Sequence, residues 1–246
     1  MIPGNANPLL LATAAADAAA AAVGPIKSLR FNPGDSAYLA RTPSSNGNLT
    51  TSTFACWVKR CDSGTNRTIL AAGDNSQDYF HFEFRSDDRI KLTTGENGST
   101  NQNLVHTEAK FRDPSAWYHV VLQLNFTDST QADRVKIYVN GTRQTLSGTI
   151  AAQNYTGTRF NRSSVDHQIG RARDSVNHLD AYLADIYFID GSALDATSFG
   201  AYDNNGVWQA AAYSGTYGTN GFHLLDFENE STVGHDSSGN NNDFTA

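Results

Sequence analysis

The sequence lacks the basic runs that mark a nucleic-acid binder. Its 18 lysines and arginines are scattered over 246 residues, and the formal net charge is −7. A protein that follows a phosphate backbone or an anionic membrane surface needs a basic stripe. We therefore expect no nucleic acid among the partners of this chain.

Cysteine is also scarce, with Cys56 and Cys61 as the only two. The residues between them are typical of a β-strand, and five extended residues span about 16 Å. A disulfide requires Cα atoms within roughly 7 Å of each other. We predict two free thiols. A chain of this length buries roughly 70–75% of its unfolded surface, so its core needs no disulfide.

A long apolar run is missing as well. Residues 9–23 are apolar but are interrupted by Asp17, and no lysine or arginine precedes Lys27. A transmembrane helix needs about 20 apolar residues, and a secretory signal begins with positive charge. We expect neither membrane insertion nor a signal peptide.

What the sequence does contain is a series of short segments with alternating polarity, separated by glycine- and asparagine-rich turns. In residues 79–85, three phenylalanines alternate with His81, Glu83 and Arg85, which places apolar and polar side chains on opposite faces of a strand. Residues 117–124 form a nearly continuous apolar run, typical of a central strand covered on both faces.

The strongest local signal is at residues 135–141, where alternating valine and isoleucine lead into Asn140-Gly141. This dipeptide supplies the positive φ angles of a two-residue hairpin turn. Further strands are expected at residues 28–31, 54–59, 89–92, 168–170, 181–189 and 222–227. The pattern predicts an all-β fold of antiparallel strands, arranged as a β-sandwich.

Several of these segments resemble the laminin-G and pentraxin-like branch of the concanavalin A-like lectin/glucanase superfamily. They are FACWVK at 54–59, WYHVV at 117–121, the hairpin at 135–141, IGR at 169–171 and YLADIYF at 182–188. The resemblance implies a concanavalin A-like jelly roll over residues 27–200. It implies little about function, because this architecture hosts lectins, adhesion modules and hydrolases.

Three stretches also resemble virion structural proteins of marine tailed phages: MIPGNANPLLLA at the start, residues 182–200 and residues 236–245. This resemblance implies location in a virion assembled in the host cytoplasm. Residues 1–26 would then be an irregular arm that docks on other virion proteins. Leu9, Leu10 and Leu11 are the candidate docking residues, because they form an exposed apolar patch unless a partner covers them. The alternative is that residues 1–26 are a disordered tail.

Residues 201–246 do not fit a simple single domain. The DSSGNNND stretch at 236–243 is similar to a loop that follows the first strand in many laminin-G proteins, but here it comes last. Either this C-terminal extension pairs back onto the sandwich, or it leads into a further domain. We slightly favour the second.

Catalytic groups are missing from the expected places. Glycosidases on this fold carry a Glu-x-Asp-x-x-Glu string that sets two carboxyl groups about 5 Å apart, and no such string occurs. Glu83 stands among apolar residues, whereas Asp185 and Asp190 are expected on opposite strand faces. Cys56 is expected to be buried, and no Gly-x-Ser-x-Gly elbow is present. We predict a protein that is not an enzyme.

Carbohydrate binding requires an exposed aromatic ring that stacks on a sugar. The candidates are aromatic residues in irregular segments, each of which could equally cover an edge of the sandwich: Tyr155, Tyr202, Trp208, Tyr213 and Tyr217.

Calcium is a further hypothesis, because the resemblance implies Ca²⁺ at the sandwich rim, where aspartate and asparagine oxygens suit this ion. The candidate ligands are Asp74 and Asp78 in one loop, and Asp174 and Asp180 in another. A polar loop with Asx turns is the simpler explanation of each. No other cofactor is expected.

The leading hypothesis is a phage virion structural protein, tail-fibre-like or displayed on the particle surface. It would present the sandwich to a host-surface glycan or to a neighbouring subunit, as one of many copies in a homo-oligomer that acts through avidity. The alternative is a Ca²⁺-dependent carbohydrate-binding lectin. A glycan hydrolase ranks third.

Overall fold

The computed structural model describes residues 27–73, 78–96, 98–173, 175–229 and 232–246. The predicted docking residues Leu9, Leu10 and Leu11 lie outside these ranges. The described residues form strands joined by turns and three short 3₁₀ helices, which are η1 (Pro33–Asp35), η2 (Gln131–Asp133) and η3 (Ala196–Ser198). None of the helices in these ranges is long and apolar enough to cross a membrane.

One of two seven-stranded antiparallel sheets, here called sheet A, has the strand order β1-β13-β3-β8-β9-β10. β1 and β16 pair with successive halves of β13, while β3 pairs with its other edge. The strands are β1 (Ser28–Phe31), β3 (Thr51–Arg60), β8 (Tyr118–Asn125), β9 (Val135–Val139), β10 (Thr142–Arg143), β13 (Ala181–Asp190) and β16 (Phe222–Leu224).

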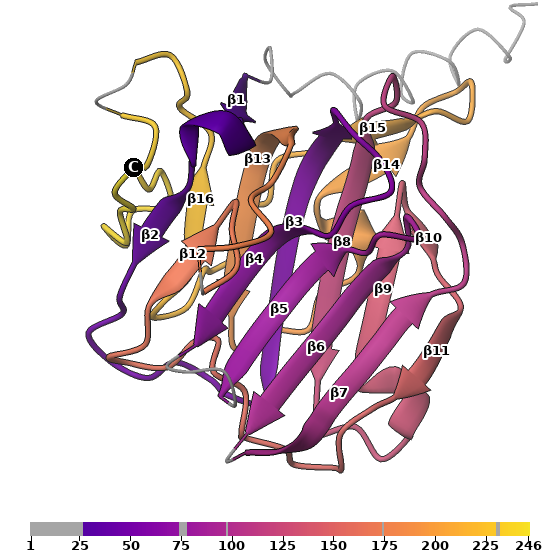
Figure 1. The fold of residues 1–246 in the computed structure, drawn as a ribbon, viewed down its shortest axis with the longest axis vertical. Coiled ribbons are helices and arrows are strands. Elements are labelled where there is room, and N and C mark those ends of the chain that lie inside the picture. Colours follow the sequence, from indigo (N-terminus) through magenta and orange to yellow (C-terminus); the bar gives the residue numbers. More distant parts are fainter. Residues whose placement is uncertain (1–26, 74–77, 97, 174, 230–231) are drawn as a thin grey trace, which may run out of the picture.

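The second seven-stranded sheet, sheet B, has the order β11-β7-β6-β5-β4-β12-β2 and lies face to face with sheet A (Figure 1). Its strands are β2 (Leu39–Arg41), β4 (Arg67–Gly73), β5 (Tyr79–Phe84), β6 (Ile90–Glu96), β7 (Ser99–Thr107), β11 (Leu146–Thr149) and β12 (His167–Ile169). A separate hairpin joins β14 (Gly200–Tyr202) to β15 (Trp208–Ala210). The predicted all-β antiparallel sandwich is confirmed.

Alternation along the strands builds the core between the sheets. Phe80, Phe82 and Phe84 on β5 are each at most 1% exposed, as the sequence pattern predicted. We call the apolar layer between the sheets the inner core. Its buried aromatic members pack with aliphatic residues from both sheets and are Phe31, Phe54, Phe80, Phe82, Phe84, Phe111, Phe126, Tyr155, Phe160, Phe188, Phe222 and Phe244.

A second apolar layer, the outer cluster, lies on the face of sheet A that points away from sheet B. Its buried members are Ala55, Val121, Tyr187, Ile189, Ala196, Phe199 and Trp208. The chain from η3 through β15 therefore covers strands that are already buried on their inner side. This double cover explains why β8 has an almost continuous apolar sequence, as predicted for a central strand.

The C-terminal extension closes the edge of the sandwich near the C-terminus in Figure 1. β16 pairs with β13, and Phe222 contacts Phe244, whose ring centroid lies 4.8 Å away. Thr245 forms an isolated bridge with Ala40 of β2. The described part of residues 201–246 thus pairs back onto the sandwich, one of the two arrangements considered for it.

A buried carboxylate organises the final turn of this extension. Asp236 accepts hydrogen bonds from the backbone N–H groups of His223, Ser238 and Asn242, each at 2.9 Å. These bonds fold the DSSGNNND stretch back on itself and attach it to β16. The polar sequence is therefore part of the packed domain.

Candidate functional site

All three tryptophans of the chain gather on the outer face of sheet A. Trp57 lies on β3, Trp117 directly precedes β8, and Trp208 begins β15. Together they line two adjoining open hollows of about 320 and 570 Å³. Volumes in this range are usual for small-molecule sites. We call this feature the tryptophan groove.

Trp208 is the best-anchored wall of the groove. Its indole Nε1 donates a 3.0 Å hydrogen bond to Nδ1 of His119, and the two rings stack with centroids 5.9 Å apart. The ring rests on two glycines, because a Cβ at Gly141 or at Gly200 would lie within 2.6 Å of its carbons. The only residue that fits beneath the indole at either place is glycine.

His119 supports the tryptophans from below. Its ring lies 5.1 Å from that of Trp57, and its backbone N–H donates to the side-chain oxygen of Asn140 at 2.7 Å. Burial lowers the pKa of His119 to about 4. The ring is therefore neutral at pH 7, which leaves Nδ1 free to accept the bond from Trp208.

The Asn140-Gly141 turn links the sandwich to the hairpin above it. Asn140 has φ of 47° and Gly141 has φ of 79°, which confirms the predicted two-residue turn. The hydroxyl of Tyr202 donates to the carbonyl of Asn140 at 2.8 Å and lies 3.2 Å from the hydroxyl of Thr142. The β14–β15 hairpin is thereby fastened over one end of the groove.

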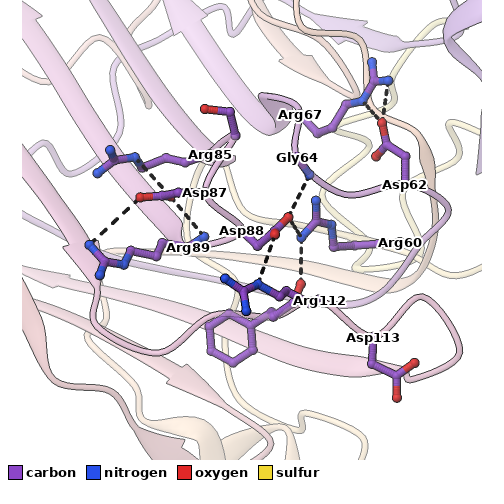
Figure 2. A network of polar contacts seen from close by, with 12 residues as sticks. Arg60, Asp62, Gly64, Arg67, Arg85, Asp87, Asp88, Arg89, Arg112 and Asp113 are labelled. Atoms are coloured by element: carbon purple, nitrogen blue, oxygen red, sulfur yellow. Dashed lines mark hydrogen bonds and ion pairs between the residues drawn. The ribbon is translucent and has the colours of Figure 1, made fainter.

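A buried ion pair between Arg60 and Asp88 holds the start of the chain segment that leads to Trp117 (Figure 2). Arg60 lies 3.0 Å from the carboxylate of Asp88 and donates a 2.6 Å hydrogen bond to the carbonyl of Phe111. The backbone N–H of Phe111 in turn donates to the carbonyl of Asp88 at 2.8 Å. Phe111 packs in the inner core and leads, six residues later, to Trp117.

The other arginines in Figure 2 also lie beside aspartates. Arg112 approaches Asp88, and Arg67 pairs with Asp62. Asp87 lies between Arg85 and Arg89 on the turn from β5 to β6. Each labelled arginine thus has an aspartate partner, and we interpret this end of the sandwich as structural rather than as an anion site.

The five predicted sugar-binding aromatics have different environments. Trp208 and Tyr202 line the groove. Tyr213 and Tyr217 are half-buried and pack against the outer cluster. Tyr155 packs in the inner core, edge-on to Phe126 at 5.3 Å, and only 9% of it is exposed. The expectation of an exposed ring is therefore wrong for Tyr155, and also for Trp208, of which only 7% is exposed.

Sequence reasoning missed Trp57 and Trp117 as site residues. Both stand in strand motifs, where an aromatic residue is usually explained by packing. The available signal was alternation: Trp57 falls between Cys56 and Val58, which point into the inner core, so its own side chain must point outward.

The predicted calcium ligands do not come together in the described part of the chain. Asp78 forms an ion pair with Arg159 at 2.6 Å, and Asp180 pairs with Arg30 at 2.5 Å. Asp74 and Asp174 lie outside the described residues. Among those described, no group of three histidine, cysteine, aspartate or glutamate side chains is placed to hold a metal.

The carboxylates on β5 and β13 are engaged in other contacts. Glu83, between two phenylalanines in the sequence, faces Lys91 at 2.5 Å and accepts from Thr68 at 3.3 Å. Asp185 occupies a β-bulge with φ of 51° and bonds to His223 at 2.7 Å. Asp190 instead accepts the backbone N–H groups of Asn48 and Asn220.

The two cysteines are free thiols, as predicted. Cys56 is completely buried, and burial raises the pKa of its thiol. The thiol therefore stays protonated at neutral pH and is unsuited to nucleophilic attack.

Solved structures with a similar arrangement of strands come from several sources. The heptameric SAP-like pentraxin of Limulus polyphemus is 18% identical, with 68% of this chain and 76% of that chain covered and a TM-score of 0.47. The CBM40 domain of the Ruminococcus gnavus IT-sialidase is 12% identical, with 66% and 95% covered and a TM-score of 0.44. Domains LG4-5 of the mouse laminin α1 chain are 12% identical, with 79% and 48% covered and a TM-score of 0.47. At these scores the similarities do not indicate what this chain binds.

No curated protein matches the chain significantly. The sequence profile of the concanavalin A-like lectin/glucanases superfamily, however, matches residues 33–198. This range contains β2 through β13 and η3, and hence most of both sheets. The chain belongs to the concanavalin A-like lectin/glucanases superfamily.

Proposed function

We propose that this chain is a carbohydrate-binding module that holds a glycan in the tryptophan groove and performs no chemistry on it. The observation that carries the proposal is the convergence of Trp57, Trp117 and Trp208 on two adjoining hollows. Sugar rings present flat faces of C–H groups, which pack favourably on the electron-rich faces of aromatic rings. Trp117 is 36% exposed and Tyr202 is 53% exposed, so ring surface is available to a ligand.

The absence of catalysis is supported by the composition of the groove. No aspartate or glutamate is among the described residues that line either hollow. Glycoside hydrolysis by the usual mechanisms requires two carboxyl groups that flank the scissile bond. The buried His119 is neutral and already bonded to Trp208, so it does not replace them.

A glycan array tests this proposal with Trp117→Ala and Leu104→Ala as a matched pair. Both remove an exposed apolar side chain, but Leu104 lies on β7 of the opposite sheet. We expect Trp117→Ala to lose at least tenfold in affinity for the glycans that the unaltered chain binds, and Leu104→Ala to keep its affinity. Equal binding by both variants, or no bound glycan at all, would overturn the proposal.

The same array in EDTA separates this mechanism from that of a Ca²⁺-dependent lectin. Because the groove is lined by aromatic, aliphatic and neutral polar side chains, we expect binding to survive EDTA. Loss of binding in EDTA that Ca²⁺ restores would favour the lectin alternative.

We further propose that the module belongs to a phage virion, as a tail-fibre-like or surface-displayed component present in many copies. The support is the sequence similarity of residues 1–12, 182–200 and 236–245 to virion structural proteins. In this setting residues 1–26, with Leu9, Leu10 and Leu11, attach the module to other virion proteins. Weak single-site binding would be amplified by avidity.

Deletion of residues 1–26 tests the virion setting. We expect the deleted protein to keep its glycan binding but to be absent from purified particles, as measured by mass spectrometry. Incorporation at the normal copy number would show that this segment is not the attachment site.

A further inference from the structure

We infer that the tryptophan groove selects uncharged oligosaccharides of at least two rings and discriminates against acidic ones such as sialylated or uronate-containing chains. The inference rests on the proposed function and adds the chemical class of the ligand. It is carried by the shape of the groove, by the charge of its lining and by one carboxylate at its rim.

The shape favours more than one sugar ring. Trp57, Trp117, Val207 and Trp208 line both hollows and therefore form the wall that they share. One hollow continues over Ala184, Gln209 and Ala210, and the other continues over Val139, Asn140, Thr142, Tyr202 and Gly206. A chain of rings can run from one hollow into the other across the tryptophans. A monosaccharide can fill only one of them.

The lining carries no counter-charge for an acid. None of the described residues that line either hollow is an arginine, lysine or histidine. Recognition of a carboxylate usually relies on a cation, most often the bidentate guanidinium of arginine. The polar groups present at the second hollow, such as the hydroxyls of Thr142 and Tyr202, suit neutral sugar hydroxyls instead.

The rim adds a negative charge. Asp203, in the turn from β14 to β15, accepts the backbone N–H groups of Asn205 at 2.8 Å and Val207 at 2.9 Å. Its second oxygen accepts the side-chain amide of Gln209 at 3.1 Å. These bonds lower the pKa of Asp203, the backbone N–H of Val207 contributing most, so the carboxylate stays ionised beside two lining residues. An acidic glycan in the groove would meet this charge without a compensating cation.

Lys59, two residues beyond Trp57 on β3, and Arg143, which follows Thr142 on β10, are cations to weigh against this conclusion. Neither lines a hollow. Arg143 forms an ion pair with Asp133 at 2.9 Å, and Lys59 interacts electrostatically with Asp113, whose pKa is lowered mainly by hydrogen bonds from Ser115 and partly by Lys59. The net charge of −7 also opposes the approach of acidic chains.

An array of matched glycan pairs tests the inference directly. Each neutral oligosaccharide is printed with and without one terminal sialic acid, and a β1,4-glucose series from one to six rings measures the dependence on length. We expect neutral members to bind at least tenfold more tightly than their sialylated partners at 0.05 M salt. Affinity should rise at least tenfold from one ring to three and then level off.

Two variants connect this selectivity to the groove. Val207→Ala, which trims the shared wall, should lose affinity three- to tenfold, whereas Val176→Ala, which trims a comparably exposed valine elsewhere, should not. Asp203→Asn keeps an oxygen for the turn but removes the charge. It should leave neutral binding within twofold and raise binding of sialylated partners about threefold at low salt.

The outcomes separate the inference from the proposed function. If sialylated chains bind best and Trp117→Ala abolishes that binding, the groove is a glycan site but the inference is wrong. The same holds if a single ring binds as tightly as three. If no glycan binds, the proposed function fails and the inference fails with it.

Discussion

The inner core and the outer cluster are built from the same strands but differ in what closes them. The inner core lies between two seven-stranded sheets, which cover it from both sides. The outer cluster is covered by a short two-stranded hairpin and irregular chain, and its rim stays open at Trp117, Tyr202 and Val207. The comparison explains why we propose the binding surface at the outer cluster: incomplete cover leaves aromatic surface exposed, and the complete sandwich beneath keeps it rigid.

Acidification is expected to have the largest effect, and it acts on one histidine in each region. The ring of His167 lies 4.8 Å from that of Phe160 in the inner core and is tilted against it by 55°, whereas His119 stacks on Trp208 of the outer cluster. Burial lowers the pKa of each to about 4. Below about pH 6.5 these histidines bind protons in the unfolded chain but stay neutral in the folded chain. The free energy of unfolding therefore falls as the pH drops from about 6.5 to 4, and below pH 4 these two histidines cause no further loss. The loss is roughly 3 kcal/mol for each histidine.

Urea unfolding at pH 7.5, 5.5 and 4.5 measures this loss. His119→Gln can still accept the bond from Trp208 but does not titrate, so it should remove about half of the pH dependence. An unchanged pH dependence of stability in His119→Gln would show that the pKa of His119 does not differ between the folded and the unfolded chain.

Truncation of one phenylalanine in each region should separate the two layers. Phe82→Ala in the inner core should cost about 3–5 kcal/mol and lower the stability of the whole domain. Phe199→Ala in the outer cluster should instead speed amide hydrogen exchange over residues 200–210, while β5 and β6 stay protected. If exchange rises equally everywhere in Phe199→Ala, the two layers unfold as a single unit.

Removal of the ion pair between Arg60 and Asp88 should have the next largest effect on stability. Asp88→Ala leaves Arg60 buried without its charge partner, which costs about 3 kcal/mol, and releases the loop that carries Trp117. Asp87→Ala, which breaks a half-exposed pair on the same turn, should cost at most about 1 kcal/mol. Thermal unfolding of both variants, followed by glycan titration, makes the comparison. Equal losses of stability would mean that the buried Arg60–Asp88 pair contributes no more than the half-exposed pair at Asp87.

The smallest expected effect concerns the fastening of the hairpin. Tyr202→Phe loses the hydrogen bond to the carbonyl of Asn140, which costs about 1 kcal/mol, and should weaken glycan binding a few-fold. Tyr182→Phe, at another exposed tyrosine, on β13, should leave binding and stability unchanged. Loss of binding in Tyr182→Phe but not in Tyr202→Phe would move the site away from the hairpin.

Much of the sandwich was predictable because its signals are local. Phe80, Phe82 and Phe84 show their common face by spacing alone, and Asn140-Gly141 specifies its turn through backbone sterics. Tyr155 was misjudged because its segment has no strand periodicity, although the segment still packs its side chains into the inner core. Periodicity reports burial only where the backbone is regular.

The groove was only partly predictable, because it depends on contacts between distant parts of the sequence. The sequence offers Trp208 and Tyr202 as candidates in segments without strand periodicity, although both lie in the β14–β15 hairpin, and it offers Trp57 and Trp117 only as strand residues. What makes them one site is the bond from Trp208 to His119, 89 positions away in sequence. No local pattern specifies that pairing, which follows from the way residues 191–217 fold over sheet A.

The pairing of β13 with both β1 and β16 has a consequence for how this protein is made. The strand bonds on one edge to Ser28–Phe31 and to Phe222–Leu224, and Phe244 then seals the inner core beside Phe222. Contacts of such long sequence separation form slowly, since the loop that joins them must close first. During synthesis the two sheets cannot be sealed until residue 244 has left the ribosome. Until then the apolar faces of a nearly complete sandwich are exposed, which makes this the stage most open to aggregation and to chaperone binding.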